Sequence, residues 1–132
     1  MGRKILVVDD DPSVCATIEY ILKSAGNEVR TTLSPSEALS LAVKGQFDLL
    51  ISDLVMPEED GIDLIRKFKR IFPRMPIVAM SGGARLGTPN TLNSAREAGA
   101  DALLGKPFDS GSLQATVEAA LAAQALNSRH GG

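Results

Sequence analysis

The chain has 132 residues, of which 44% are hydrophobic and 23% are charged, and its formal net charge is −2 at pH 7. This length matches a single domain of about 100–150 residues. A chain of this size buries roughly two-thirds of its unfolded surface, so folding needs no disulfide or metal. The small net charge supplies no basic field for nucleic acid or anionic lipid. Single copies of cysteine (Cys15) and histidine (His130) exclude a disulfide framework, a thiolate zinc cluster and a multi-histidine metal site.

The sequence shows no targeting or membrane-spanning pattern. The apolar run at residues 5–8 is much shorter than a signal peptide requires. No apolar run approaches the ~20 residues that span a bilayer. We therefore expect a cytoplasmic protein that makes no contact with a membrane and no direct contact with nucleic acid.

Five short apolar runs predict β-strands: Ile5–Val8, Glu28–Thr32, Phe47–Ser52, Pro76–Met80 and Ala102–Leu104. The first, third and fourth runs are almost continuous in valine, isoleucine, leucine and methionine, which is typical of strands buried on both faces. The second and fifth runs are more mixed in composition, and we place them nearer the edges of a sheet.

Helical patterns follow the strands and begin at recognisable signals. Asp11 precedes Pro12, which combines an N-cap acceptor with a proline at the first helical position. Residues 34–37 form a capping-box pattern with proline at its second position. The other expected helices start after Asp60, after Pro89 and after Asp109.

Five strands alternating with five helices predict an α/β fold in which helices cover both faces of a parallel sheet. With right-handed crossovers, the expected arrangement is the flavodoxin-like, doubly wound (βα)5 sheet with strand order 2-1-3-4-5. We assign residues 3–126 to this domain and residues 127–132 to a disordered tail. The loop at residues 82–91, rich in glycine and proline, is expected to be the most mobile segment.

Polar residues follow four of the five predicted strands, at the edge where this fold binds its ligands. These residues are Asp9, Asp10 and Asp11 after the first strand, Asp53 after the third, Ser81 after the fourth and Lys106 after the fifth. Because the carboxyl ends of parallel strands meet at one edge of the sheet, we expect these side chains to converge on one site.

The residue types at this edge indicate a particular chemistry. Three or four neighbouring carboxylates repel one another and raise one pKa unless a divalent cation is bound. Carboxylate and carbonyl oxygens suit Mg²⁺, which often serves phosphate chemistry. A lysine and a hydroxyl facing such an ion complete a phosphoryl clamp, and an aspartate that attacks phosphorus forms an acyl phosphate.

Six short motifs occur in a consistent order and spacing. They are ILVVDDD at 5–11, SDLVMP at 52–57, DG at 60–61, MSG at 80–82, AGAD at 98–101 and KPF at 106–108. With these motifs the chain resembles the receiver domain of two-component response regulators over nearly its whole length. The resemblance implies a signalling module that takes a phosphoryl group from a sensor histidine kinase or a histidine phosphotransfer protein and then changes its partner binding.

The resemblance also implies which residues receive the phosphoryl group and hold the metal. Asp53 would be the phosphoacceptor, and Asp9, Asp10, Asp53 and the backbone carbonyl of Val55 would bind Mg²⁺. The chain would then not be an enzyme acting on other molecules, because its chemistry is limited to phosphorylating itself and losing the phosphoryl group to water.

Further roles are implied for the residues at the ends of the last two strands. Ser81 would hydrogen-bond the phosphoryl group when the switch closes, and Lys106 would form an ion pair with it. Gly82 matches a small residue that leaves the phosphate accessible. The bond between Lys106 and Pro107 corresponds to a cis peptide bond in the family.

Two departures from the family pattern concern output rather than phosphorylation. Leu103 stands where the family usually has tyrosine or phenylalanine, and the loop after Ser81 is a few residues longer than usual. Both lie on the face formed by the fourth helix, fifth strand and fifth helix, where we expect a downstream partner to bind. Because 26 residues follow Lys106, we expect a single-domain regulator or an excised part of a larger protein.

Two other functions compete with this interpretation. One is a small Mg²⁺-dependent phosphatase of the haloacid-dehalogenase type, in which Asp9 is the nucleophile and Asp11 the acid/base. The other is a receiver-like scaffold that is never phosphorylated, although a scaffold needs none of the acidic residues, Ser81 or Lys106.

Overall fold

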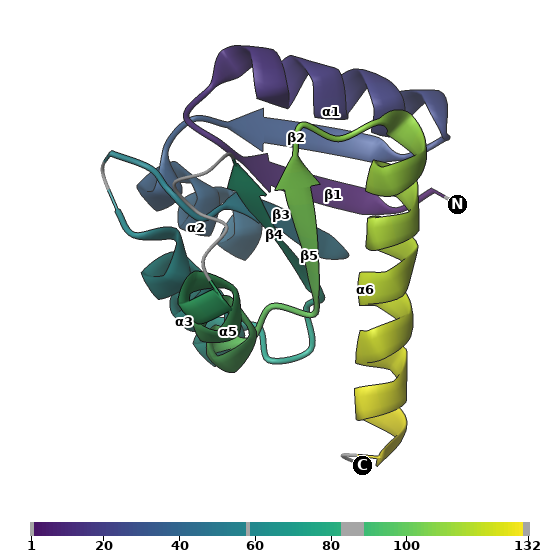
Figure 1. Ribbon diagram of the computed structural model, residues 1–132. Coiled ribbons are helices and arrows are strands. Elements are labelled where there is room, and N and C mark those ends of the chain that lie inside the picture. Colours follow the sequence, from purple (N-terminus) through teal and green to yellow (C-terminus); the bar gives the residue numbers. More distant parts are fainter. Residues whose placement is uncertain (1, 58, 83–88, 131–132) are drawn as a thin grey trace.

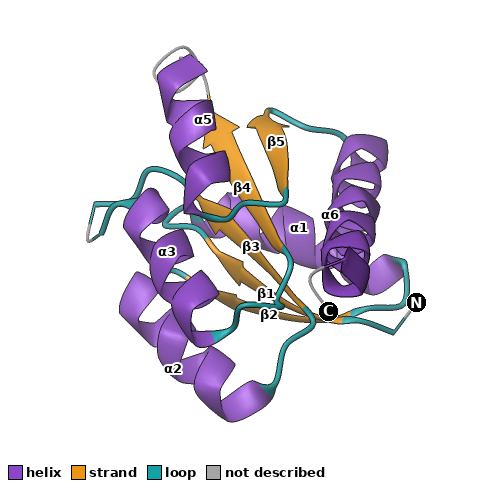
Figure 2. Ribbon diagram, turned by 90° about the horizontal axis from the view of Figure 1, so that it is seen from below, coloured by secondary structure: helices purple, strands orange, loops and turns teal. Residues whose placement is uncertain are grey.

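The computed structural model describes residues 2–57, 59–82 and 89–130. In chain order its elements are β1 (Lys4–Val8), α1 (Pro12–Ser24), β2 (Glu28–Thr32), α2 (Pro35–Gly45), β3 (Leu49–Asp53), α3 (Gly61–Ile71), β4 (Ile77–Gly82), α5 (Pro89–Ala98), β5 (Ala102–Lys106) and α6 (Ser110–His130). The strands form one parallel sheet in the order β2-β1-β3-β4-β5, with helices on both faces (Figures 1 and 2). The predicted fold class and strand order are therefore confirmed.

Two hydrophobic cores lie on opposite faces of the sheet. Leu50 and its neighbours pack against α2, α3 and α5, whereas Ile51 packs against α1 and α6. Side chains of a strand alternate between faces, so the two cores draw on alternate positions of the same strands. All four residues of the predicted first strand, Ile5–Val8, are completely buried. This is why the central strands are continuous apolar runs in the sequence rather than alternating ones.

The last two strands, β4 and β5, end later than the sequence indicates. β4 extends to Gly82 and β5 extends to Lys106, because Ser81 pairs with Gly105 and Gly82 pairs with Lys106 in the parallel ladder. Ser81 thus lies within a strand rather than after it. Pairing with a neighbour decides where a strand stops, and that information is absent from the local apolar pattern.

The C-terminal helix is longer than expected. α6 runs to His130 and so continues four residues into the segment that we assigned to a disordered tail. Residues 127–130 contain neither glycine nor proline, so no local signal ends the helix before the final two residues. In the predicted mobile loop, residues 83–88 lie outside the described part of the chain, and α5 begins at Pro89. No helix in the described ranges has both the length and the apolar character needed to cross a membrane.

The helix starts follow the predicted caps with one difference. Asp11, Asp60 and Asp109 each accept a backbone N–H from the first turn of the following helix. In the capping-box pattern, the Ser34 hydroxyl accepts the Glu37 N–H at 3.4 Å. The Glu37 carboxylate, however, accepts the Thr32 hydroxyl at 2.5 Å, while that hydroxyl accepts the Ser34 N–H at 3.2 Å. The Ser34 N–H is therefore linked to the Glu37 carboxylate indirectly, through the hydroxyl of Thr32 at the end of β2.

An ion pair joins α3 to Asp101, the residue before β5. It lies at the amino-terminal edge of the sheet, opposite the carboxyl ends of the strands. Lys69 Nζ lies 3.1 Å from Asp101 Oδ2 and donates a second hydrogen bond to Met75 O at 2.9 Å. The same Nζ donates to Gln124 Oε1 at 3.3 Å. Asp101 Oδ2 also accepts the Ile77 N–H at 2.8 Å. The Asp101 side chain is 8% exposed, so this cluster ties α3, β4, β5 and α6 together with little access to water.

Replacing Asp101 by alanine is expected to lower the free energy of unfolding by about 2 kcal/mol, because the Lys69 charge and the Ile77 N–H lose their buried acceptor. Urea denaturation followed by circular dichroism measures the change. The matched control is Asp63→Ala, which breaks an exposed ion pair with Arg66 on the surface of α3 and should cost less than about 0.5 kcal/mol. A loss for Asp101→Ala no larger than that for the control would show that the Asp101 contacts stabilise the fold no more than an exposed ion pair does.

Candidate phosphoryl-transfer site

Three carboxylates meet at the carboxyl edge of the sheet. Asp9 follows β1, Asp53 ends β3, and these neighbouring strands pair in parallel up to Val8 and Ser52. Ligand oxygens of Asp9, Asp10 and Asp53 all lie within 4.8 Å of one another. Asp9 is completely buried, Asp53 is 6% exposed, and Asp10 is exposed. The predicted convergence of the first and third strand ends is thus present.

Lys106 reaches this cluster from β5. Its Nζ lies 2.7 Å from Asp9 Oδ2 and 3.4 Å from Asp53 Oδ2. The bond between Lys106 and Pro107 is cis, as the resemblance implies. A Cβ added to Gly82 would lie 3.3 Å from Lys106 Cδ, so the absence of a side chain at residue 82 leaves room for the lysine stem. The lysine therefore lies against the two buried carboxylates.

The backbone around Asp9 is held by hydrogen bonds from three directions. The Asp9 N–H donates to Thr32 O at 3.2 Å, and the Cys15 thiol donates to Asp9 O at 3.5 Å. Asp9 Oδ1 accepts the Asp11 N–H at 2.9 Å, which leaves Oδ2 for Lys106. Sequence reasoning did not connect Thr32 or Cys15 with Asp9, because nothing local to either residue indicates this contact.

The charges of the site are incompletely balanced. Burial raises the pKa of Asp53, and the negative charge of Asp9 raises it further against the opposing effect of Lys106. Burial lowers the pKa of Lys106, but its hydrogen bond to Asp9 and the charge of Asp53 outweigh burial, so that its pKa is raised. Lys106 is therefore protonated at neutral pH, and the carboxylates still favour an additional cation.

A cavity of about 440 Å³ opens above these carboxylates. Asp11, Val55 and Gly82 line it together with the three carboxylates and Lys106. The donors are hard oxygens around a solvent-accessible space, which fits Mg²⁺ better than a softer metal. The residues present thus fit the metal ion that the resemblance implies.

Comparison with known proteins decides the family. Residues 5–118 match the family model described as the response regulator receiver domain. The chain belongs to this family. It is 43% identical over 117 residues to the DNA-binding transcriptional regulator NtrC of Azospirillum brasilense, an alignment that covers 89% of this chain and 24% of NtrC. The transcriptional regulatory protein ZraR of Salmonella typhimurium is 38% identical over 118 residues, which cover 89% of this chain and 26% of ZraR.

Solved receiver structures have the same fold. NtrX from Brucella abortus superposes with a TM-score of 0.90 at 29% identity, over 99% of this chain and 30% of NtrX. The chemotaxis response regulator CheY4 of Vibrio cholerae superposes with a TM-score of 0.83 at 30% identity, over 92% of this chain and the whole of CheY4. The receiver thus spans about a quarter of the length of its NtrC and ZraR relatives. Receiver domains accept a phosphoryl group from histidine kinases and act as signalling switches.

Ser81 stands apart from the carboxylate cluster. It is half-buried near the end of β4, and it does not line the cavity above the carboxylates. Leu103, at the position where the family usually has an aromatic residue, packs against the core that faces α2, α3 and α5. The structure therefore brings together Asp9, Asp10, Asp53 and Lys106, whereas Ser81 is outside the cavity lining that these residues share.

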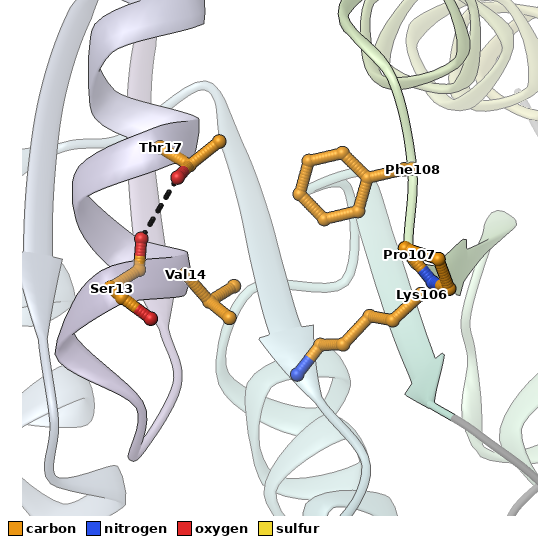
Figure 3. Close-up of a pocket in the computed structure, with 6 residues that line it drawn as sticks. All are labelled: Ser13, Val14, Thr17, Lys106, Pro107 and Phe108. Carbon is orange, nitrogen blue, oxygen red and sulfur yellow. Dashed lines mark hydrogen bonds between the residues drawn. The ribbon is translucent and has the colours of Figure 1, made fainter.

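A second cavity of about 420 Å³ adjoins the site (Figure 3). Val14 on α1 and Phe108 after β5 face each other across it. Lys106 also lines this cavity, and its Nζ pairs with Asp9. Ser13 and Thr17 complete the α1 wall. Sequence reasoning assigned Phe108 to a family motif but did not predict that the first turns of α1 would face it, because that proximity depends on how α1 packs on the sheet.

Proposed function

We propose that the receiver accepts a phosphoryl group on Asp53. The observation that carries this proposal is the position of the Asp53 carboxylate, which ends a buried strand beneath an open cavity, 3.4 Å from a protonated lysine. Asp53 is 6% exposed, so one face of the carboxylate is held by the protein. A nucleophile in this position can meet a donor from the cavity side.

The proposed reaction exchanges one bond to phosphorus for another. A carboxylate oxygen of Asp53 attacks the phosphorus of a phosphohistidine, the nitrogen–phosphorus bond breaks, and its electron pair returns to the imidazole ring. The product is an acyl phosphate on Asp53. Lys106 offsets negative charge on the transferring oxygens, and it is already positioned by Asp9 before the donor arrives. Attack by water on the acyl phosphate later restores the carboxylate.

Mg²⁺ would be held by Asp9, Asp10, Asp53 and the backbone carbonyl of Val55. When bound, the ion supplies positive charge for the phosphoryl oxygens. The raised pKa of Asp53, which follows from burial and from Asp9, supports this assignment. The structure contains the oxygen-rich cluster that such an ion requires.

We propose that Ser81 and the face formed by α5, β5 and α6 carry the signal onward. The Ser81 hydroxyl would donate a hydrogen bond to the phosphoryl group, which requires a movement at the end of β4 since Ser81 does not line the cavity. Leu103 carries no hydroxyl and packs inward, so output would depend on this movement and on α5 rather than on an aromatic ring.

The phosphatase alternative has no support from the comparisons, since the matched family model is the receiver domain. In the structure, both carboxylate oxygens of Asp9 are already engaged, Oδ1 by the Asp11 N–H and Oδ2 by Lys106, whereas a nucleophile needs a free oxygen. A scaffold that is never phosphorylated would need none of the contacts between Lys106 and the two buried carboxylates. These contacts therefore favour the phosphoacceptor over the scaffold.

Incubation of the chain with acetyl phosphate and Mg²⁺, followed by intact-mass analysis, tests the proposed function. We expect one phosphoryl group per chain, lost on alkaline hydrolysis as an acyl phosphate is, and mapped to the peptide that contains Asp53. Chelation of divalent cations should slow the reaction. An unchanged mass under all conditions, including a histidine kinase donor, would favour the scaffold.

The second cavity leads us to propose where the phosphodonor docks. Thr17→Arg is expected to lower the rate of phosphotransfer from a phosphohistidine protein about tenfold, because the larger side chain fills a contact surface. The rate with acetyl phosphate should change by less than about twofold, since a small donor needs no such surface. The control is Tyr20→Arg, which places the same side chain at a residue of α1 that is 75% exposed and does not line the cavity. Equal rates for the two variants with the protein donor would place docking elsewhere.

A further inference from the structure

Two cavities meet at Phe47, at the edge of the sheet opposite Asp53. One has a volume of about 440 Å³ and is lined by Phe47, Phe72 and Met75 among others. The other has a volume of about 340 Å³ and has walls of Phe47 and Leu41. Phe47 precedes β3, and the cavities include the residues that start β1 and β2 or precede β4. We call the two cavities together the Phe47 surface.

The Phe47 ring is held in place before any partner arrives. Lys4 Nζ lies 5.0 Å from the ring centroid and donates a hydrogen bond to Gly45 O at 2.6 Å. A Cβ added to Gly45 would lie 2.8 Å from Phe47 Cε2, so the ring packs closely on the end of α2. Lys4 covers one side of the ring, and Phe47 lines both cavities. Because the Phe47 ring is already held in one position, binding of a partner would cost little side-chain conformational entropy.

The charges around the Phe47 surface are unequal. Arg30, Lys44 and Arg74 line the cavities, are exposed, and form no ion pair with any residue that the structure describes. The two lining carboxylates both have partners. Glu28 lies 3.9 Å from Lys4 Nζ, and the Asp48 carboxylate accepts the Lys4 N–H at 2.8 Å. The surface is therefore positive although the whole chain has a net charge of −2.

We propose that the Phe47 surface docks an acidic peptide segment of a partner protein, anchored by an apolar side chain. The apolar walls provide burial for the anchor, and the three free cations complement carboxylates beside it. Because the Phe47 surface lies at the opposite edge of the sheet from Asp53, such a partner can bind whether or not Asp53 is phosphorylated. Nucleic acid fits less well, since Lys4 covers one side of the Phe47 ring and the Phe72 ring packs against Phe68, which leaves little aromatic face on which bases can stack.

Titration of the isotope-labelled full chain with synthetic peptides, followed by NMR at low salt, tests this proposal. The probe is a hexapeptide with a central leucine–phenylalanine pair flanked by two acidic residues on each side. We expect saturable shifts of the amides of Lys4, Arg30, Lys44, Phe47 and Arg74. Replacing the apolar pair by serines, or the acidic flanks by lysines, should weaken binding at least fivefold.

Lys44→Glu should weaken binding of the acidic hexapeptide about fivefold, because it replaces an attraction by a repulsion at the rim. The matched control is Lys23→Glu on α1, which makes the same change in net charge outside the Phe47 surface and should leave the affinity unchanged. The proposal fails if no saturable shifts occur, if all three peptides bind alike, or if both variants weaken binding equally. It also fails if an oligouridylate shifts the same amides at lower concentration, because the surface would then bind nucleic acid.

Discussion

Asp53→Asn is expected to abolish addition of a phosphoryl group from acetyl phosphate, whereas Asp9→Asn should slow the addition about ten- to hundredfold but leave it complete at long times. An amide cannot form the acyl phosphate, so loss of Asp53 removes the acceptor itself. Asp9 orients Lys106 at 2.7 Å, and its loss weakens the assistance given to the reaction. Intact-mass time courses in Mg²⁺ measure both effects.

Folding of the two variants serves as the control for this experiment. Asparagine has almost the same shape as aspartate, and at either position it removes one of two carboxylates that repel each other. Both variants should therefore keep the circular dichroism spectrum of the native chain. The reverse pattern, in which Asp9→Asn abolishes the reaction and Asp53→Asn does not, would identify Asp9 as the nucleophile and overturn the proposed function.

Gly61→Ala is expected to lower the free energy of unfolding by about 3 kcal/mol and to slow phosphorylation as well. Gly61 is the first residue of α3 and is buried against the end of β3. A Cβ at this position would lie 2.3 Å from Asp53 O and 2.5 Å from Leu54 Cα. Both neighbours are backbone atoms, so relief of the overlap must move the segment that carries Asp53. Urea denaturation and the acetyl phosphate assay measure the two effects.

The matched control is Gly111→Ala in the first turn of α6. A Cβ at Gly111 would contact a single atom, Asp109 Oδ1, at an ordinary distance of 3.6 Å. Alanine is favoured over glycine within helices by up to about 1 kcal/mol, so this variant should be as stable as the native chain or more stable. If Gly61→Ala proved as stable as Gly111→Ala and the native chain, the close approach at Gly61 would be relieved at no cost.

Much of the candidate site could be predicted because its residues follow buried strands. Asp9 and Asp53 come directly after apolar runs, and parallel strands carry such residues to a common edge. Lys106 could be placed by the same argument. Ser81 fits it less well, because β4 continues through Ser81 and Gly82 by pairing with β5. The contacts of Thr32 and Cys15 with Asp9 have no local signal at all.

The sequence by itself determined the fold class, the strand order and the residues that supply carboxylates and lysine, because apolar periodicity and helix caps are local properties. The tertiary structure alone decided which of those residues touch. It buried Asp9 at the carboxylate cluster and brought Lys106 to 2.7 Å from it. It also set α1 opposite Phe108 and made the space for Gly61 too small for a side chain. These facts depend on how helices and strands distant in sequence pack together, and no local pattern encodes that packing.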